Sequence, residues 1–81
     1  MSTVKTPQRT LFWARRCLFI ERNLVEIRAD RRDAADRAQK IDDLLDYATS
    51  SAANAEAEGY DDTATYILQV IDDVLAMKAK P

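Results

Sequence analysis

Five aspartates have side chains that could assemble a cation site, because they recur close together in two stretches of the chain. They are Asp42, Asp43, Asp46, Asp72 and Asp73. Carboxylate oxygens are the ligands that hard cations such as Mg²⁺ prefer. The spacing, however, matches neither an EF-hand loop nor the Glu-x-x-His pattern of di-iron bundles. We therefore interpret these aspartates as a solvated acidic face and predict neither a metal site nor a cofactor.

The chain lacks the usual general base of nucleophilic catalysis, because it contains no histidine. Histidine is the leading general base and metal ligand near neutral pH. The hydroxyl run Thr49 to Ser51 therefore has no imidazole to activate it. The single cysteine, Cys17, falls on an apolar row, where a small core residue is the simpler interpretation than a reactive thiol. We predict that the protein is not an enzyme. A lone cysteine also favours a reducing compartment, so we expect a cytoplasmic location.

An aromatic pair in a basic segment points to binding. Phe12 and Phe19 are seven residues apart, so they would lie on one side of a helix, and that side is otherwise polar. Exposed aromatics bordered by arginines have the composition of a binding hot spot. The predicted partner-binding residues are Phe12, Arg15, Arg16, Phe19, Arg22 and Asn23. Either an unidentified partner protein or a second copy of this chain could cover them.

The same segment suggests an alternative, a regulatory protein that associates with nucleic acid through its basic N-terminal helix. Its arginines are Arg9, Arg15, Arg16, Arg22, Arg28, Arg31 and Arg32. They are spread around the helix instead of forming one stripe, and the net charge of the chain is −2, so we rank nucleic-acid binding below protein binding. The apolar stretch at residues 11–20 is interrupted by two arginines and is too short to span a membrane.

Composition indicates an all-helical fold. The 81 residues include one glycine and two prolines, and residues 8–58 contain neither type, whereas a sheet needs such residues to turn the chain. We expect a disordered N-terminus over residues 1–6 and a single helical domain over residues 7–81. Thr6 and Pro7 form a favourable helix start, and Gly59 is a favourable helix end. These signals predict a first helix over about 7–58 and a shorter helix over about 61–78.

Whether the first helix is continuous depends on residues 26–41, "EIRADRRDAADRAQKI". Apolar residues spaced alternately by four and three keep one register from Trp13 to Ala55, which favours a single helix. A break near residues 30–33 is the alternative, because Arg31 places a charge on this row and Asp30 and Asp33 could each cap a new helix. We predict the continuous helix.

The apolar faces are too wide for one hairpin to cover. Residues 1–32 hold eight basic and three acidic groups, whereas residues 33–81 hold four basic and eleven acidic groups, so the two parts should lie along each other. We predict an antiparallel dimeric helical bundle, a coiled-coil-like homodimer; the alternative is a monomeric three-helix bundle. The predicted oligomer interface contains Trp13, Cys17, Ile20, Leu24, Ile27, Arg31, Ile41, Leu45, Ile67 and Ile71. The expected function is a small interaction module that acts as an adaptor, regulator or inhibitor.

Overall fold

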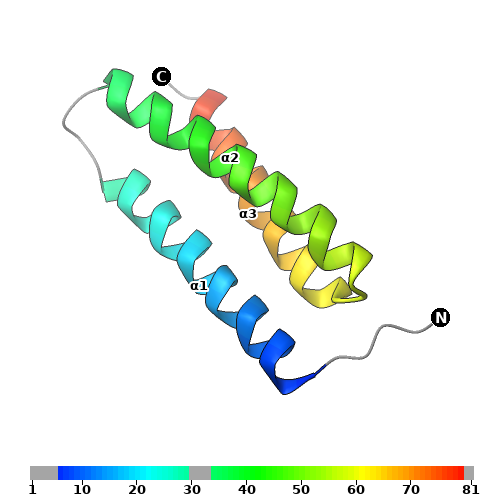
Figure 1. Cartoon of the computed structure of the whole chain (residues 1–81). Helices are drawn as coiled ribbons and strands as arrows, with labels where there is room; N and C mark the ends of the chain where they lie inside the picture. The colour runs from blue at the N-terminus through cyan, green and yellow to red at the C-terminus, as the bar shows by residue number, and fades with distance from the viewer. Residues whose placement is uncertain (1–5, 30–33, 80–81) are drawn as a thin grey trace.

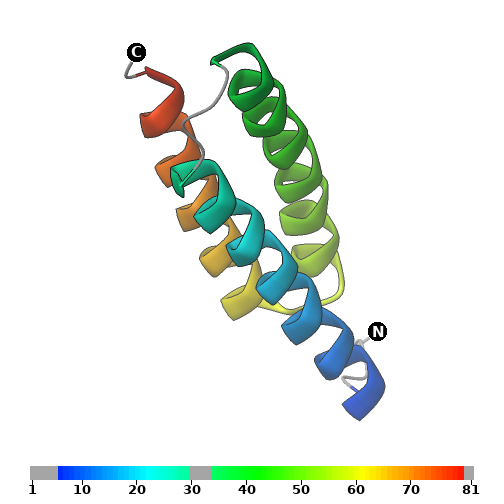
Figure 2. The same cartoon turned by 90° about the vertical axis from the view of Figure 1, so that its left-hand side faces the viewer.

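The computed structural model describes residues 6–29 and 34–79, and these residues form three α-helices (Figure 1). Helix α1 spans Pro7–Ala29, α2 spans Ala34–Ala57 and α3 spans Asp61–Ala79. The helices run up, down and up, and they pack side by side as a bundle (Figures 1 and 2). The all-helical prediction is therefore confirmed.

The predicted cap at the start of α1 is present. The Thr6 hydroxyl accepts a hydrogen bond from the backbone N–H of Arg9 at 3.1 Å, and Pro7 occupies the first helical position. A side-chain oxygen at this position satisfies an N–H group that has no partner within the helix. The expectation of disorder covers residues 1–6, of which residues 1–5 lie outside the described residues.

Gly59 ends α2 as predicted, with a φ of 84°. Its N–H donates to the carbonyl of Glu56 at 3.0 Å, and the N–H of Tyr60 donates to the carbonyl of Ala55 at 2.8 Å. This pair of hydrogen bonds is a Schellman motif, which needs a left-handed residue that glycine adopts without strain. The chain enters α3 at once, because the Tyr60 carbonyl accepts the first helical hydrogen bond from Ala64.

The prediction of one continuous helix over 7–58 was wrong. Helices α1 and α2 are separate and antiparallel, and the Arg37 side chain at the start of α2 donates a 3.3 Å hydrogen bond to the carbonyl of Ile27 near the end of α1. Residues ten apart in one helix would be separated by about 15 Å along its axis. Folding back lets both helices bury their apolar faces within one chain, which a single long helix could not do. Arg31 and its neighbours at 30–33 lie outside the described residues.

The core lies along the centre of the three helices. Helices α2 and α3 share the most extensive contact, and α1 lies across both of them (Figure 2). Small side chains, Ala48, Ala52 and Ala55, are buried on α2 and let α3 approach closely. Polar links join α1 to α3 at the surface, where the Tyr66 phenol donates to Glu21 at 2.6 Å and Arg28 pairs with Asp73.

Most residues of the predicted oligomer interface lie in this core. Among them, Trp13, Ile20, Leu24, Ile27, Ile41 and Ile67 are buried, and Cys17, Leu45 and Ile71 are partly buried against the same cluster. Their cover comes from the other helices of the same chain, so their burial does not require a second copy. The homodimer itself stays a prediction. No helix in residues 6–29 and 34–79 is long and apolar enough to cross a membrane.

Candidate functional site

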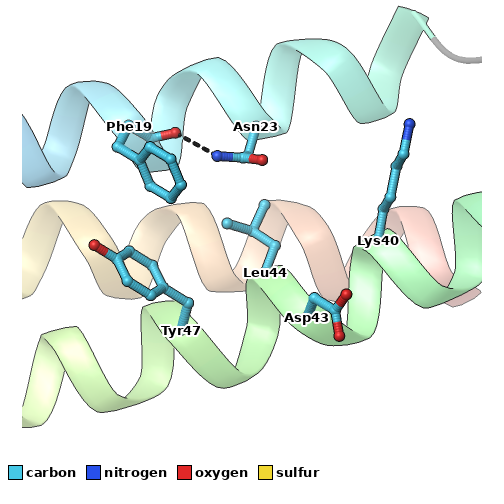
Figure 3. A pocket seen from close by; sticks show the side chains of 6 residues that line it. All are labelled: Phe19, Asn23, Lys40, Asp43, Leu44 and Tyr47. Carbon is cyan, nitrogen blue, oxygen red and sulfur yellow. Dashed lines mark hydrogen bonds between the residues drawn. The ribbon is translucent and has the colours of Figure 1, made fainter.

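Two adjoining pockets form a shallow groove between α1 and α2. One, of about 290 Å³, is drawn in Figure 3 and is lined by Phe19, Asn23, Lys40, Asp43, Leu44 and Tyr47. The other, of about 270 Å³, is lined by Phe12, Arg15, Arg16, Phe19 and Tyr47. Phe19 from α1 and Tyr47 from α2 belong to both pockets, so the pockets are neighbours. We call the nine lining residues together the α1–α2 groove.

Aromatic rings form the apolar wall of this groove. The rings of Phe19 and Tyr47 meet edge to face with their centroids 5.3 Å apart. Phe12 meets the ring of Trp13 in the same manner at 5.2 Å. These contacts position the rings without covering them, because Phe12 remains 38% exposed and Phe19 remains 53% exposed. The groove therefore presents aromatic surface that is held in place by its neighbours.

The Arg16 guanidinium lies among the same rings. Its central carbon is 4.7 Å from the ring centroid of Tyr47, 5.4 Å from that of Phe12 and 5.5 Å from that of Trp13. Cation–π attraction at these distances orients the planar guanidinium. The Arg16 Nε atom is buried and has no hydrogen-bond partner within the described part of the chain. The side chain is thus placed by stacking and not by an ion pair.

Glu58 supports the end of the groove that contains Phe12. Its carboxylate accepts hydrogen bonds from the Arg9 guanidinium, at 3.1 Å for the Nε donor, and from the Trp13 indole N–H at 3.0 Å. These donors, Arg9 first, lower the pKa of Glu58 because they favour its charged form. Arg9 in turn lies 4.4 Å from the ring centroid of Phe12. Glu58 therefore ties the turn before α3 to the first turns of α1.

The structure brings together five of the six predicted partner-binding residues. Phe12, Arg15, Arg16, Phe19 and Asn23 all line the groove. The Asn23 amide also donates to the Phe19 carbonyl at 2.8 Å, which holds its side chain against the helix (Figure 3). Arg22 is exposed and is not among the lining residues, because it points about 60° further around α1 than Phe19.

Sequence reasoning missed the half of the groove that α2 contributes. Lys40, Asp43, Leu44 and Tyr47 lie on α2 and line the first pocket together with Phe19 and Asn23 of α1 (Figure 3). No pattern near Phe12 or Phe19 in the sequence indicates these four residues. In the continuous helix that was predicted, they would lie far from Phe12 and Phe19 along the helix axis. An antiparallel turn near residues 30–33 would have placed Tyr47 beside Phe19.

Three of the five aspartates considered for cation binding have partners of other kinds. Asp42 forms an ion pair with Lys78 at 2.9 Å, Asp73 pairs with Arg28 at 3.6 Å, and Asp43 accepts a 2.9 Å hydrogen bond from Gln39. In the described residues, no three histidine, cysteine or acidic side chains gather in a way that could hold a metal ion.

Cys17 is partly buried against the core and forms no disulfide. Burial, and to a smaller extent the charge of Glu21, raises the pKa of its thiol. A raised pKa keeps the sulfur as the unreactive thiol near neutral pH. This position agrees with the interpretation of Cys17 as a packing residue.

Comparison of the chain with models of protein families, with curated proteins and with solved structures found no match.

Proposed function

We propose that this chain is a small non-enzymatic interaction module that binds a partner protein in the α1–α2 groove. The observation that carries the proposal is Phe19, which stands on the wall shared by two pockets and keeps about half of its surface exposed. Large aromatic side chains in preformed, partly apolar recesses are the residues that most often dominate the free energy of protein binding. The consequence of binding for the partner protein would decide whether the module acts as an adaptor, a regulator or an inhibitor.

The shape of the groove supports a helical or extended segment as the bound element. Its walls are two adjacent helices, and the lining residues follow α1 for about three turns, from Phe12 to Asn23. Binding of an amphipathic helix in a groove of this type uses apolar anchors at helical spacing. The rings are already held by contacts with their neighbours, so binding would cost little ordering of the aromatic side chains.

The test is affinity capture from the source cell with three purified forms of the protein. These are the wild type, the double variant Phe12→Ala/Phe19→Ala, and the control Glu56→Ala, which removes an exposed side chain of α2 outside the groove. We expect a protein that the wild type and the control retain equally and that the double variant loses. Identical capture by all three forms would contradict the proposal.

A binding measurement with the captured protein then gives the magnitude. Calorimetry should show that Phe19→Ala weakens the complex by about 2 kcal/mol or more, which is the cost that marks a residue that dominates an interface. Far-UV circular dichroism of each variant checks that the bundle is intact. A change below about 0.5 kcal/mol would show that the partner binds elsewhere.

The nucleic-acid alternative receives less support from the positions of the arginines. Arg9 is engaged by Glu58 and Arg28 by Asp73, so two of the basic groups on α1 already have acidic partners. If the arginines bound phosphate groups, the affinity of the protein for nucleic acid would fall steeply as the salt concentration rises. Tight and strongly salt-dependent binding of mixed-sequence DNA or RNA would reverse this ranking.

We also propose that the module associates with a second copy of itself. Outside the groove, Leu11, Leu18 and Val25 form a row at seven-residue spacing on α1, and each is about half exposed. Leu68 and Leu75 form a similar row on α3. Exposed apolar rows at this spacing are typical of helices that pack against another helix, and they support self-association through surfaces other than the core.

The charges beside these rows support their pairing. Arg15 and Arg22 flank the row on α1, whereas Asp72 lies next to the row on α3, according to helical spacing. Sedimentation over a range of concentrations should give a mass above 9.2 kDa, and Leu18→Glu should return it to that of one chain. A wild-type mass of one chain at high micromolar concentration would contradict this proposal.

A further inference from the structure

We propose that the α1–α2 groove recognises a carboxylate carried beside a large apolar side chain, so that the bound segment of the partner is acidic and amphipathic. This inference rests on the proposed function and specifies its ligand chemistry. It follows from the charged residues that line the groove and from the positions of the acidic side chains near them.

The groove carries more positive than negative charge in a chain whose net charge is −2. Arg15, Arg16 and Lys40 line it, against one acidic residue, Asp43. Glu58, whose charge interacts with Arg16, is not among the lining residues, and its carboxylate is hydrogen-bonded to Arg9 and Trp13. The excess of positive charge is therefore concentrated at the groove.

Neither arginine of the second pocket forms an ion pair or a hydrogen bond with an acidic side chain of the described residues, although the charge of Arg16 interacts with that of Glu58. Arg15 has no ion pair or hydrogen bond there. Arg16 is held by three aromatic rings, and its Nε has no acceptor. A guanidinium that is oriented by stacking and is not hydrogen-bonded to a carboxylate is prepared to donate two parallel hydrogen bonds to one.

The aromatic wall defines the neighbour of such a pair. Phe12, Phe19 and Tyr47 line the second pocket beside Arg15 and Arg16, so a ligand carboxylate at the arginines would lie next to apolar surface. Each pocket has the volume to receive one large apolar side chain, about 270 Å³ in the case of the second. The complementary ligand therefore combines a carboxylate with an aromatic or aliphatic group within one or two residues.

A nucleic-acid backbone fits these observations less well than an acidic peptide. Asp43 lies in the first pocket and would repel successive phosphates that followed the groove. The apolar wall would also gain little from a phosphate chain, because specific apolar anchors are a feature of peptide binding. Binding of oligonucleotides at the groove is accordingly one of the outcomes that would overturn the proposal.

The experiment compares three fluorinated probes that share the 4-fluorobenzyl group and differ in charge. They are 4-fluorophenylacetate, 4-fluorobenzyl alcohol and 4-fluorobenzylamine, each titrated into the full chain and followed by ¹⁹F and ¹H–¹⁵N NMR. The single tryptophan, Trp13, lies beside Arg16 and supplies one indole N–H signal as a local reporter. We expect the anion to bind at least about threefold more tightly than the alcohol, as an exposed or partly buried ion pair adds up to about 1 kcal/mol.

Variants locate the charge that is responsible. Arg15→Gln should lower the preference for the anion and Arg15→Gln/Arg16→Gln should abolish it, whereas the control Arg22→Gln on the same helix should preserve it. Arg15 is exposed, so its single variant tests the proposal even if the double variant perturbs folding. Equal affinity for the three probes in the wild type would overturn the proposal, and so would a preference that survives in Arg15→Gln/Arg16→Gln.

These experiments distinguish failure of the carboxylate inference from failure of the proposed function. A captured partner that is lost with Phe12→Ala/Phe19→Ala but is retained with Arg15→Gln/Arg16→Gln would refute the carboxylate and leave the interaction module intact. Loss of the partner in both double variants, together with a preference for the anionic probe, would support both proposals. Signals that shift for Phe19 and Tyr47 show that the probes occupy the groove; shifts confined to other surfaces would overturn the inference.

Discussion

Replacing Ser51 with alanine is expected to stabilise the protein, because the Ser51 hydroxyl is buried and finds no hydrogen-bond partner among residues 6–29 and 34–79. The residue lies fully inside the bundle on α2, and its Oγ forms no hydrogen bond within the described part of the chain. Removing a hydroxyl from water without replacing its hydrogen bonds costs about 1–3 kcal/mol. Alanine is also the better helix former, by roughly 0.5 kcal/mol.

The opposing term is small. Deleting one oxygen leaves a void of roughly 10–15 Å³, which at about 24 cal/mol per Å³ costs about 0.3 kcal/mol. The free energy of unfolding should therefore rise by about 1–3 kcal/mol in Ser51→Ala. For a domain of this size, each 1 kcal/mol raises Tm by about 4–8 °C.

Urea and thermal unfolding, both followed by far-UV circular dichroism, measure this change. Ser50→Ala is the matched control, because Ser50 is exposed on the same helix and its variant reports helix propensity alone. We expect the control to change the free energy of unfolding by no more than about 0.5 kcal/mol. If Ser51→Ala gains no more stability than the control, or loses stability, the hydroxyl has a partner and the reasoning is refuted.

Three further predictions concern the surface hydrogen bonds and the core. The hydrogen bond from Arg9 holds the pKa of Glu58 below its usual range, so its contribution to stability is present above that range and is lost as the pH falls through the lowered pKa; thermal melts on acidification should fall less steeply for Glu58→Gln than for the wild type. The hydrogen bond to Glu21 raises the pKa of Tyr66 to about 12, so its contribution to stability is present at neutral pH and is lost as the pH rises towards 12. Ultraviolet titration of the wild type and of Glu21→Gln should show that the variant shifts the ionisation of Tyr66 to lower pH. Ile67 is fully buried, so Ile67→Ala should lower the free energy of unfolding by about 2–5 kcal/mol in urea titrations, and a loss below 1 kcal/mol would show that the core is not packed as described.

The ends of the helices could be predicted from the sequence because their causes are local. The Thr6 hydroxyl reaches an N–H three residues away, and Gly59 adopts a backbone conformation that other residues avoid. Neither effect depends on distant parts of the chain. The core residues were predictable for a similar reason, since the apolar spacing that aligns Trp13 with Ile27 also aligns them in the bundle.

Half of the candidate site was equally predictable. Phe12 and Phe19 share one side of any helix that contains them, so their proximity follows from the helical repeat. Tyr47 and Leu44 complete the groove only because α2 returns along α1. Their contribution depends on contacts between residues about 25 positions apart, which no local pattern specifies.

The sequence by itself determined that the chain is helical, where the helices start and end at Thr6 and Gly59, and which side of each helix is apolar. Only the tertiary structure decided that the stretch from Pro7 to Ala57 forms two helices and not one. The apolar register is the same in both cases, because two antiparallel helices that face a common core repeat the spacing of one long helix. Whether one long helix or two antiparallel helices form depends on which residues pack against each apolar side chain. Within one chain, those residues are available only when α1 folds back onto α2 and α3.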